Sequence, residues 1–167
     1  APAPHAHSSE EIKKHVHIPV ATVARINEPW IAEELIANGK TDICMIGRPN
    51  LCDSEFANKA YAGKAEDIRP CIGCGRCLNG IMFGKPISCT VNPSVETNAI
   101  EKATEKKKVL VIGGGPAGME AAYVAKKRGH EVVLCEKSNE LGGLLRIAAV
   151  PISKQELCKV IKFMARR

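Results

Sequence analysis

Four cysteines have the spacing of a metal-binding set. Cys71, Cys74 and Cys77 form a C-x2-C-x2-C run, and eleven residues separate Cys77 from Cys89. Thiolates suit iron–sulfur clusters and zinc. A structural zinc site usually takes its ligands as two separated pairs, whereas these cysteines divide three and one. The spacing therefore favours a [4Fe–4S] cluster bound by the four cysteines, and zinc is the alternative.

The other four cysteines belong to no such motif. Because the first residues show neither a basic nor an apolar export segment, the eight cysteines indicate reduced thiols rather than a disulfide framework. We therefore expect a cytoplasmic protein. Cys44 and Cys135 lie in apolar runs and are expected in the core. We assign no chemical role to Cys44, Cys52, Cys135 or Cys158.

A second motif begins at Gly113. The apolar run 109–112 leads into the sequence GGGPAG, a helix is predicted over 119–127, and a strand over 131–135 ends at Glu136. Strand, glycine turn, helix, strand and acid at these intervals are the signature of a dinucleotide-binding βαβ unit. The sequence therefore predicts a dinucleotide site.

Each glycine of this motif has its own task. Gly113 makes the tight turn, Gly115 lets a pyrophosphate approach the backbone, and Gly118 allows helix and strand to pack closely. The helix N-terminus presents unpaired N–H groups to the pyrophosphate. Glu136, 23 residues after Gly113, is placed to accept hydrogen bonds from an adenosine ribose. The turn Leu141-Gly142-Gly143 can also bring backbone near the cofactor.

The N-terminal part of the chain predicts two β/α units of a parallel sheet. Apolar, strand-like runs cover 16–23 and 42–46, and helices are predicted over 30–37 and from Asp53 to about 62. Alternation of strand and helix is typical of an α/β fold.

Both of these strands end in an arginine. Arg25 follows the first, and Gly47-Arg48 follows the second. In a (β/α)8 barrel the loops after strands seven and eight commonly form a phosphate site. Two arginines there would clamp a phosphate, and Gly47 would let the backbone approach it. From spacing alone, two surface charges explain the arginines equally well.

Composition excludes several classes of protein. The chain has 167 residues, 45% of them hydrophobic, and a net charge of +6. The lysines near 102–108 lack interleaved aromatic residues, so they indicate a solvated linker rather than a nucleic-acid surface. No apolar run is long enough for a membrane span. We therefore expect neither a nucleic-acid nor a membrane partner.

The ordered combination of these motifs resembles one family. The motifs occur in the order found in iron–sulfur flavoenzymes such as 2,4-dienoyl-CoA reductase, 2-enoate reductase and trimethylamine dehydrogenase. They are Val23–Asn27, Gly47–Asp53, the four cysteines, Asn92-Pro93, the glycine motif with Glu136 and the Leu141–Gly143 turn. The chain departs from the family at Ala24, where glycine is frequent, and in having two residues between Cys74 and Cys77, where many members have three.

The resemblance implies an α/β protein built from four consecutive segments. These are the C-terminal part of an FMN-binding (β/α)8 barrel (1–66), a [4Fe–4S] segment (67–92), a linker (93–107) and the start of a Rossmann-like FAD or dinucleotide-binding domain (108–167). It implies that Arg25, Gly47 and Arg48 hold the FMN phosphate and that Cys71, Cys74, Cys77 and Cys89 bind the cluster. Gly113, Gly115, Gly118, Glu136, Gly142 and Gly143 would bind the adenine dinucleotide.

The resemblance also implies an activity. The expected parent enzyme reduces activated C=C bonds of enoates or enoyl-CoA esters with NAD(P)H, and electrons pass through FAD, the cluster and FMN. The substrate pocket and proton donor would lie outside these residues, so the chain would be an inactive internal piece. One alternative is an amine dehydrogenase. Another is a non-enzymatic interaction module that carries a metal and binds a nucleotide.

Overall fold

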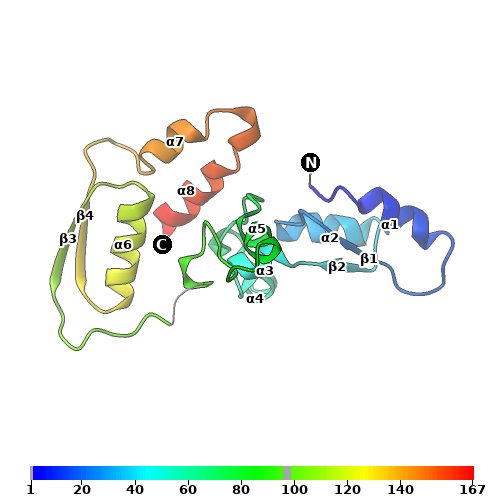
Figure 1. Cartoon of the computed structure of the whole chain (residues 1–167), viewed down its shortest axis with the longest axis horizontal. Helices are drawn as coiled ribbons and strands as arrows, with labels where there is room; N and C mark the ends of the chain where they lie inside the picture. Colours follow the sequence, from blue (N-terminus) through cyan, green and yellow to red (C-terminus); the bar gives the residue numbers. More distant parts are fainter. Residues whose placement is uncertain (1, 96–98) are drawn as a thin grey trace. The chain divides into compact units, whose positions relative to one another are not determined.

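The computed structural model consists of two compact units, Ala1–Glu96 and Thr97–Arg167, and describes residues 2–95 and 99–167. Unit 1 contains α1 (Ala6–Lys13), β1 (Ala21–Val23), α2 (Pro29–Ala37), β2 (Ile43–Met45), α3 (Arg48–Cys52), α4 (Phe56–Tyr61), η1 (Ala65–Asp67), α5 (Arg76–Met82) and η2 (Pro93–Val95) (Figure 1). Unit 2 contains β3 (Lys108–Ile112), α6 (Pro116–Lys127), β4 (Glu131–Cys135), α7 (Leu144–Ala148), η3 (Ile152–Lys154) and α8 (Leu157–Arg166).

The first sheet is a parallel pair, as the alternation of strand and helix predicted. β1 pairs with β2 in a register that places Thr22 opposite Cys44. These two residues share the face on which α2 packs, and the core there is formed by Ile26, Ile31 and Leu35. Pro29 begins α2, where its missing N–H costs no hydrogen bond. The mixed α/β character with parallel strands is confirmed.

The first strand is much shorter than predicted. The run 16–23 was expected to be one strand, but only Ala21–Val23 pairs with β2. Pro19 has no N–H to give to a ladder, and the N–H of Val20 donates to the Asp42 carboxylate instead, at 2.8 Å. Apolar content alone therefore overstated the length of the strand.

Unit 2 is built on a second parallel pair. β3 and β4 pair from Lys108–Glu131 to Ile112–Cys135, and α6 connects them and packs on one face. α8 packs against α6 and α7, which buries Met119, Val160 and Phe163. The predicted strand–helix–strand order is therefore present.

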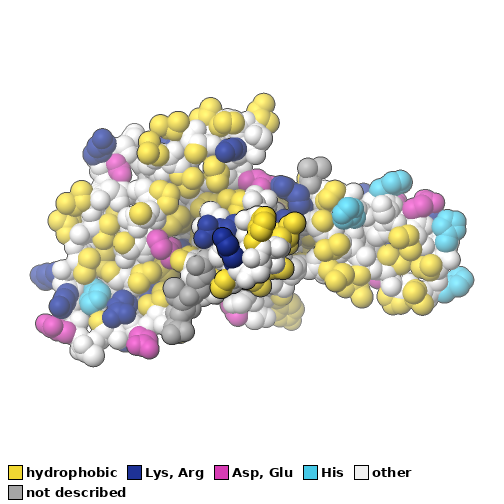
Figure 2. All heavy atoms as spheres, viewed as in Figure 1, with side chains coloured by type: hydrophobic (Ala, Val, Ile, Leu, Met, Phe, Trp, Pro, Cys, Tyr) yellow, Lys and Arg dark blue, Asp and Glu magenta, His cyan; other side chains and the backbone are white. Residues whose placement is uncertain are grey.

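Each sheet also has an apolar face that no layer of the described residues covers. On the first sheet, Met45 is 55% exposed, and on the second, Ile112 is 84% exposed. Cys135 lies on the exposed face of the second sheet, because alternate residues of β4 point to opposite sides. The prediction that Cys135 is buried in the core is therefore wrong. Hydrophobic side chains are visible on the surface of both units (Figure 2). Parallel sheets are normally covered on both faces, so both sheets present an incomplete core.

None of the described helices combines the length and the apolar character that crossing a membrane requires.

The Asp53 carboxylate joins α4 to the segment that follows it. The side chain is 8% exposed and accepts hydrogen bonds from the Arg69 backbone N–H (2.8 Å) and the Lys59 ammonium (2.6 Å). Asp53 was predicted to begin a helix, but α4 begins three residues later, at Phe56. Burial alone would raise the pKa of Asp53, yet these hydrogen bonds outweigh it and hold the pKa below its usual range.

We predict that Asp53→Asn destabilises the chain by about 2 kcal/mol at pH 7, because an amide cannot accept every hydrogen bond that the carboxylate accepts. A lowered folded-state pKa gives stability that is complete above about pH 4 and is lost as the pH falls through that lower pKa. Urea unfolding between pH 7 and pH 2.5 should show the wild type converging on the variant only in acid. Glu33→Gln, on an exposed position of α2, should shift stability by less than about 0.5 kcal/mol. Equal stability of wild type and Asp53→Asn at pH 7 would contradict the prediction.

Candidate functional site

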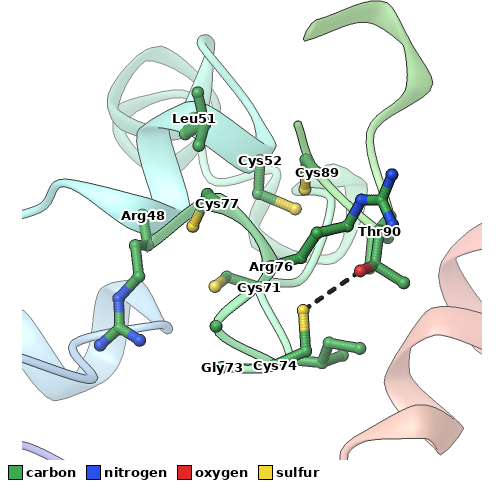
Figure 3. Close-up of a pocket in the computed structure, with 13 residues that line it drawn as sticks. Arg48, Leu51, Cys52, Cys71, Gly73, Cys74, Arg76, Cys77, Cys89 and Thr90 are labelled. Atoms are coloured by element: carbon green, nitrogen blue, oxygen red, sulfur yellow. Dashed lines mark hydrogen bonds between the residues drawn. The ribbon is translucent and has the colours of Figure 1, made fainter. Parts of the chain in front are cut away.

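The four cysteines of the sequence motif line one cavity in unit 1 (Figure 3). Cys71 and Cys74 precede α5, Cys77 lies in its first turn, and Cys89 comes from the segment beyond it. Arg48 and Arg76 line the same cavity. Residues up to 41 positions apart in the sequence therefore line one cavity, and most of its reactive side chains are cysteine thiols.

Hydrogen bonds fix both ends of the cysteine loop, the segment 71–89 that carries the four cysteines. The hydrogen bonds are Asn27 Nδ2 to the Cys71 carbonyl (3.0 Å), the Arg69 N–H to Asp53 (2.8 Å), Arg69 Nη1 to the Val91 carbonyl (2.8 Å) and Asn92 Nδ2 to the Leu51 carbonyl (3.2 Å). These bonds tie the loop to the β/α elements and position the sulfur atoms without a regular ladder.

Glycines allow the loop to turn between the cysteines. Gly73 and Gly75 have φ of +63° and +77°, a region that side chains rarely adopt. A Cβ on Gly73 would also lie 3.0 Å from Arg25 Nη1, so the guanidinium of Arg25 rests against the loop. The Cys74 sulfur lies 3.2 Å from the Thr90 hydroxyl (Figure 3).

The protonation of two cysteines is perturbed in opposite directions. Burial raises the pKa of the Cys71 thiol, although the Gly73 N–H and the Arg48 guanidinium act against it. The pKa of Cys89 is lowered to about 5, chiefly by a hydrogen bond with Cys52 and further by the backbone N–H groups of Val91 and Asn92. A thiolate is the form that binds a metal, so Cys89 is prepared for ligation at neutral pH.

Four cysteine thiols on one cavity match an iron–sulfur cluster in number and chemistry, and the cluster stays a prediction. The described residues do not place three or more His, Cys, Asp or Glu side chains around one point as a single metal ion requires. Zinc needs four donors at about 2.0–2.3 Å from one centre. In a four-iron cluster each thiolate binds a different iron, so the sulfur atoms stand around a larger body. The four cysteines that line one cavity provide the number of thiol ligands that such a cluster binds.

The two arginines predicted to bind a phosphate both border the cysteine loop. Ala24 and Arg25 have φ of +83° and +51°, so the backbone is strained directly after β1. This strain explains why glycine suits position 24. A Cβ on Gly47 would meet nothing within 4 Å, which leaves open space above the backbone beside Arg48. Phosphate binding by Arg25, Gly47 and Arg48 stays a prediction.

The glycine loop of unit 2 requires glycine for reasons within the protein. Gly113 has φ of +101°, and its N–H donates to the Cys135 carbonyl at 2.7 Å. A Cβ on Gly118 would lie 1.9 Å from the Gly113 carbonyl oxygen, so α6 could not pack on the strand. Gly115 differs, because a Cβ there would meet nothing within 4 Å. Space above Gly115 is what a bound pyrophosphate would use.

Glu136 and the second glycine turn both contact this loop. The Glu136 carboxylate accepts the Gly114 N–H at 2.6 Å and the Ser138 N–H at 3.0 Å, and these bonds lower its pKa, the Ser138 bond most. The Gly142 N–H donates to the Gly114 carbonyl at 2.8 Å. Glu136 therefore also orders the loop, a role beyond the ribose contact predicted for it. The 141–143 turn contacts the glycine loop, and its contact with a cofactor stays a prediction.

Several residues that build these sites were not identified from the sequence. Cys52 was assigned no role, yet it is 1% exposed and lines the cysteine cavity. Asn27 was given no role and Asp53 was expected only to begin a helix, yet both form hydrogen bonds with the cysteine segment. All three lie in segments that carry the family resemblance, but their partners are far away in the sequence, so spacing alone could not have shown these contacts.

Comparison with known proteins places the chain among flavoenzymes. Residues 108–162 match a family of FAD dependent oxidoreductases. The chain is 46% identical to an NADH oxidase of Thermoanaerobacter brockii over 89% of its length and 40% identical to a cinnamate reductase of Clostridium sporogenes over 93%. These alignments cover 24% of each relative, so the chain spans about a quarter of their length.

A solved structure also matches almost the whole chain. A 2-naphthoyl-CoA reductase in complex with 2-naphthoyl-CoA superposes with a TM-score of 0.93 at 33% identity, over 99% of this chain and 26% of the reductase. Amine dehydrogenases also occur among the relatives and the matching structures.

We predict that Gly118→Ala and Gly115→Ala fail in different ways. Gly118→Ala should destabilise unit 2 by several kcal/mol, because its Cβ would overlap the Gly113 carbonyl. Gly115→Ala should leave the fold intact, because its Cβ has space and its φ of −72° suits alanine. It should nevertheless weaken dinucleotide binding at least tenfold, because the methyl group would occupy the space of the pyrophosphate.

Thermal unfolding and titration with ADP separate the two effects. Unchanged nucleotide affinity in Gly115→Ala would show that the pyrophosphate does not cross this glycine.

Proposed function

This chain belongs to the flavoenzyme family of 2,4-dienoyl-CoA reductase, 2-enoate reductase and trimethylamine dehydrogenase, and we propose that it carries the electron-transfer centre of an NAD(P)H-dependent reductase of activated C=C bonds. The observation that carries the proposal is one cavity lined by Cys71, Cys74, Cys77 and Cys89, followed in the chain by a glycine loop of the dinucleotide-binding type. Both features belong to one chain of a flavin oxidoreductase family.

In this proposal each unit holds part of the redox machinery. The four cysteines bind a [4Fe–4S] cluster, and Gly113, Gly115, Gly118, Glu136 and the turn at Gly142 and Gly143 bind FAD. Arg25, Gly47 and Arg48 hold the phosphate of FMN. When bound, the flavins exchange electrons in pairs or singly, while the cluster carries one at a time.

The residues of this chain prepare the sites for those groups. Arg48 and the backbone N–H groups of Val91 and Asn92 provide positive charge and hydrogen bonds near the cysteine sulfurs. Gly115 leaves space for a pyrophosphate, and Glu136 orders the loop that would receive it. The half-buried cavity limits the access of water to Cys71, Cys77 and Cys89.

The uncovered sheet faces support a larger parent protein. We propose that β1 and β2 belong to the C-terminal part of an FMN-binding (β/α)8 barrel over 1–66 and that β3 and β4 begin a Rossmann-like domain over 108–167, with the cluster segment (67–92) and a linker (93–107) between them. A barrel needs about 250 residues, and both sheets expose apolar faces that further strands and helices would cover.

The substrate class follows from the relatives and is part of the proposal. A cinnamate reductase and a 2-naphthoyl-CoA reductase are among the proteins similar to this chain, so an enoate or enoyl-CoA ester is the proposed substrate. Amine dehydrogenases among the relatives support a second candidate, oxidation of a small amine. Assays of the full-length protein with cinnamate and NADH, and with dimethylamine and an electron acceptor, would separate the two.

We predict about four irons and four acid-labile sulfides per chain after anaerobic reconstitution, because four thiolates surround one cavity. Cys77→Ala removes one ligand and should lose most of the iron and sulfide, whereas Cys158→Ala, an exposed cysteine outside the cavity, should lose none. Stoichiometric zinc without sulfide would contradict the proposal and favour a non-enzymatic metal-bearing module.

The same substitution tests the relay role in the full-length protein. We expect Cys77→Ala to stop NAD(P)H-driven turnover, while NAD(P)H still bleaches the flavin absorbance of the dinucleotide-binding domain in stopped flow. Chemical reduction with dithionite should still support reduction of the substrate, because its pocket lies elsewhere. Normal NAD(P)H turnover in a variant shown to lack iron and sulfide would end the relay proposal.

A further inference from the structure

A hydroxyl group contacts one of the sulfur atoms in the cysteine cavity. Thr90 directly follows Cys89 and lines the cavity, and its Oγ1 atom lies 3.2 Å from the Sγ atom of Cys74. This hydrogen bond joins two side chains that are 16 residues apart in the chain (Figure 3). It therefore connects the segment of the fourth cysteine to the C-x2-C-x2-C run.

Two further hydrogen bonds fix the segment that carries this hydroxyl. On one side, Arg76 Nε donates to Ser88 Oγ at 2.8 Å. On the other side, Arg69 Nη1 donates to the Val91 carbonyl at 2.8 Å. Neither bond involves a cysteine sulfur. The surrounding chain therefore holds the hydroxyl in place independently of the sulfur that it contacts.

Iron ligation would decide which of the two atoms donates. The geometry of the contact allows either the thiol or the hydroxyl to be the donor. A cysteine binds a metal as a thiolate, which has no proton to give. When Cys74 ligates iron, the Thr90 hydroxyl must therefore donate and the Cys74 sulfur must accept. A hydrogen bond to an ionised acceptor is also stronger than one between neutral groups.

We propose that Thr90 is a positioning residue that donates its O–H to the Cys74 sulfur and thereby raises the reduction potential of the cluster. The inference rests on the proposed binding of a [4Fe–4S] cluster by the four motif cysteines. It assigns Thr90 to the surroundings of the cluster and not to its ligands.

The direction of the effect follows from charge. Reduction adds one electron to the cluster, which makes the ligating sulfurs more negative and strengthens a hydrogen bond to any of them. The hydroxyl therefore stabilises the reduced state more than the oxidised state. Thr90 and Cys74 are both exposed, so water can reach this sulfur when the hydroxyl is absent. Valine places a methyl group where the hydroxyl was and keeps water from taking over the bond.

The test is a redox titration of the reconstituted full-length protein with dithionite, in which EPR follows the reduced cluster. Thr90→Val should retain iron and sulfide and show a lower midpoint potential than the wild type. Thr90→Ser keeps the donor, so its midpoint potential should match that of the wild type. Ser94→Ala removes an exposed hydroxyl of the same unit that does not line the cavity, and it should leave the potential unchanged.

The outcomes separate this inference from the proposed function. An unchanged midpoint potential in Thr90→Val would overturn the role of Thr90 alone. A serine variant with a potential as low as that of the valine variant would also overturn it, because the donor would then be irrelevant. Loss of iron and sulfide from Thr90→Val would replace the effect on the potential with a role in retaining the cluster. A wild-type protein without iron and sulfide would overturn the proposed cluster itself.

Discussion

The cysteine segment depends on hydrogen bonds from side chains that lie outside it. Between Ile68 and Val91, all of which the structure describes, α5 is the one helix or strand, so the loop backbone cannot satisfy itself through a ladder. Asn27 and Asp53 supply the missing partners from the β/α elements. A backbone with unmet donors and acceptors would not keep one shape in a half-buried position. The sulfur positions are therefore set by the packing of the sheet and helices around the loop.

Opposing influences act on the ionisation of the thiols in this region. Burial in the cavity opposes ionisation, as the raised pKa of Cys71 shows. Arg48, the backbone N–H groups beyond Cys89 and the thiol of Cys52 act in the other direction. The cavity thus combines limited access of water with local donors, a combination that lets a protein adjust the potential of a bound redox centre.

The two units position the residues of their sites by different means. In unit 1, polar side chains reach across to an irregular loop. In unit 2, the backbone segments themselves come into contact, and glycines make this close approach feasible. Gly118 has no room for a Cβ beside the Gly113 carbonyl. Glu136 adds a hydrogen bond to the loop at Gly114. Substitution of one polar side chain should therefore disturb only part of the cysteine cavity. A methyl group at Gly118 should disrupt the whole glycine loop.

The sequence by itself determined the features that depend on local spacing. The cysteine run and the glycine motif could be identified because their residues are close in the chain, and β3, α6 and β4 follow the predicted pattern. Strand length was less accessible, because Pro19 and the Asp42–Val20 hydrogen bond end the pairing that apolar content suggested. Only the tertiary structure placed Cys52 beside Cys89 and Asp53 beside Arg69. These partners are separated by 37 and 16 residues, and their contacts depend on how α3 and α4 pack, which no local pattern encodes.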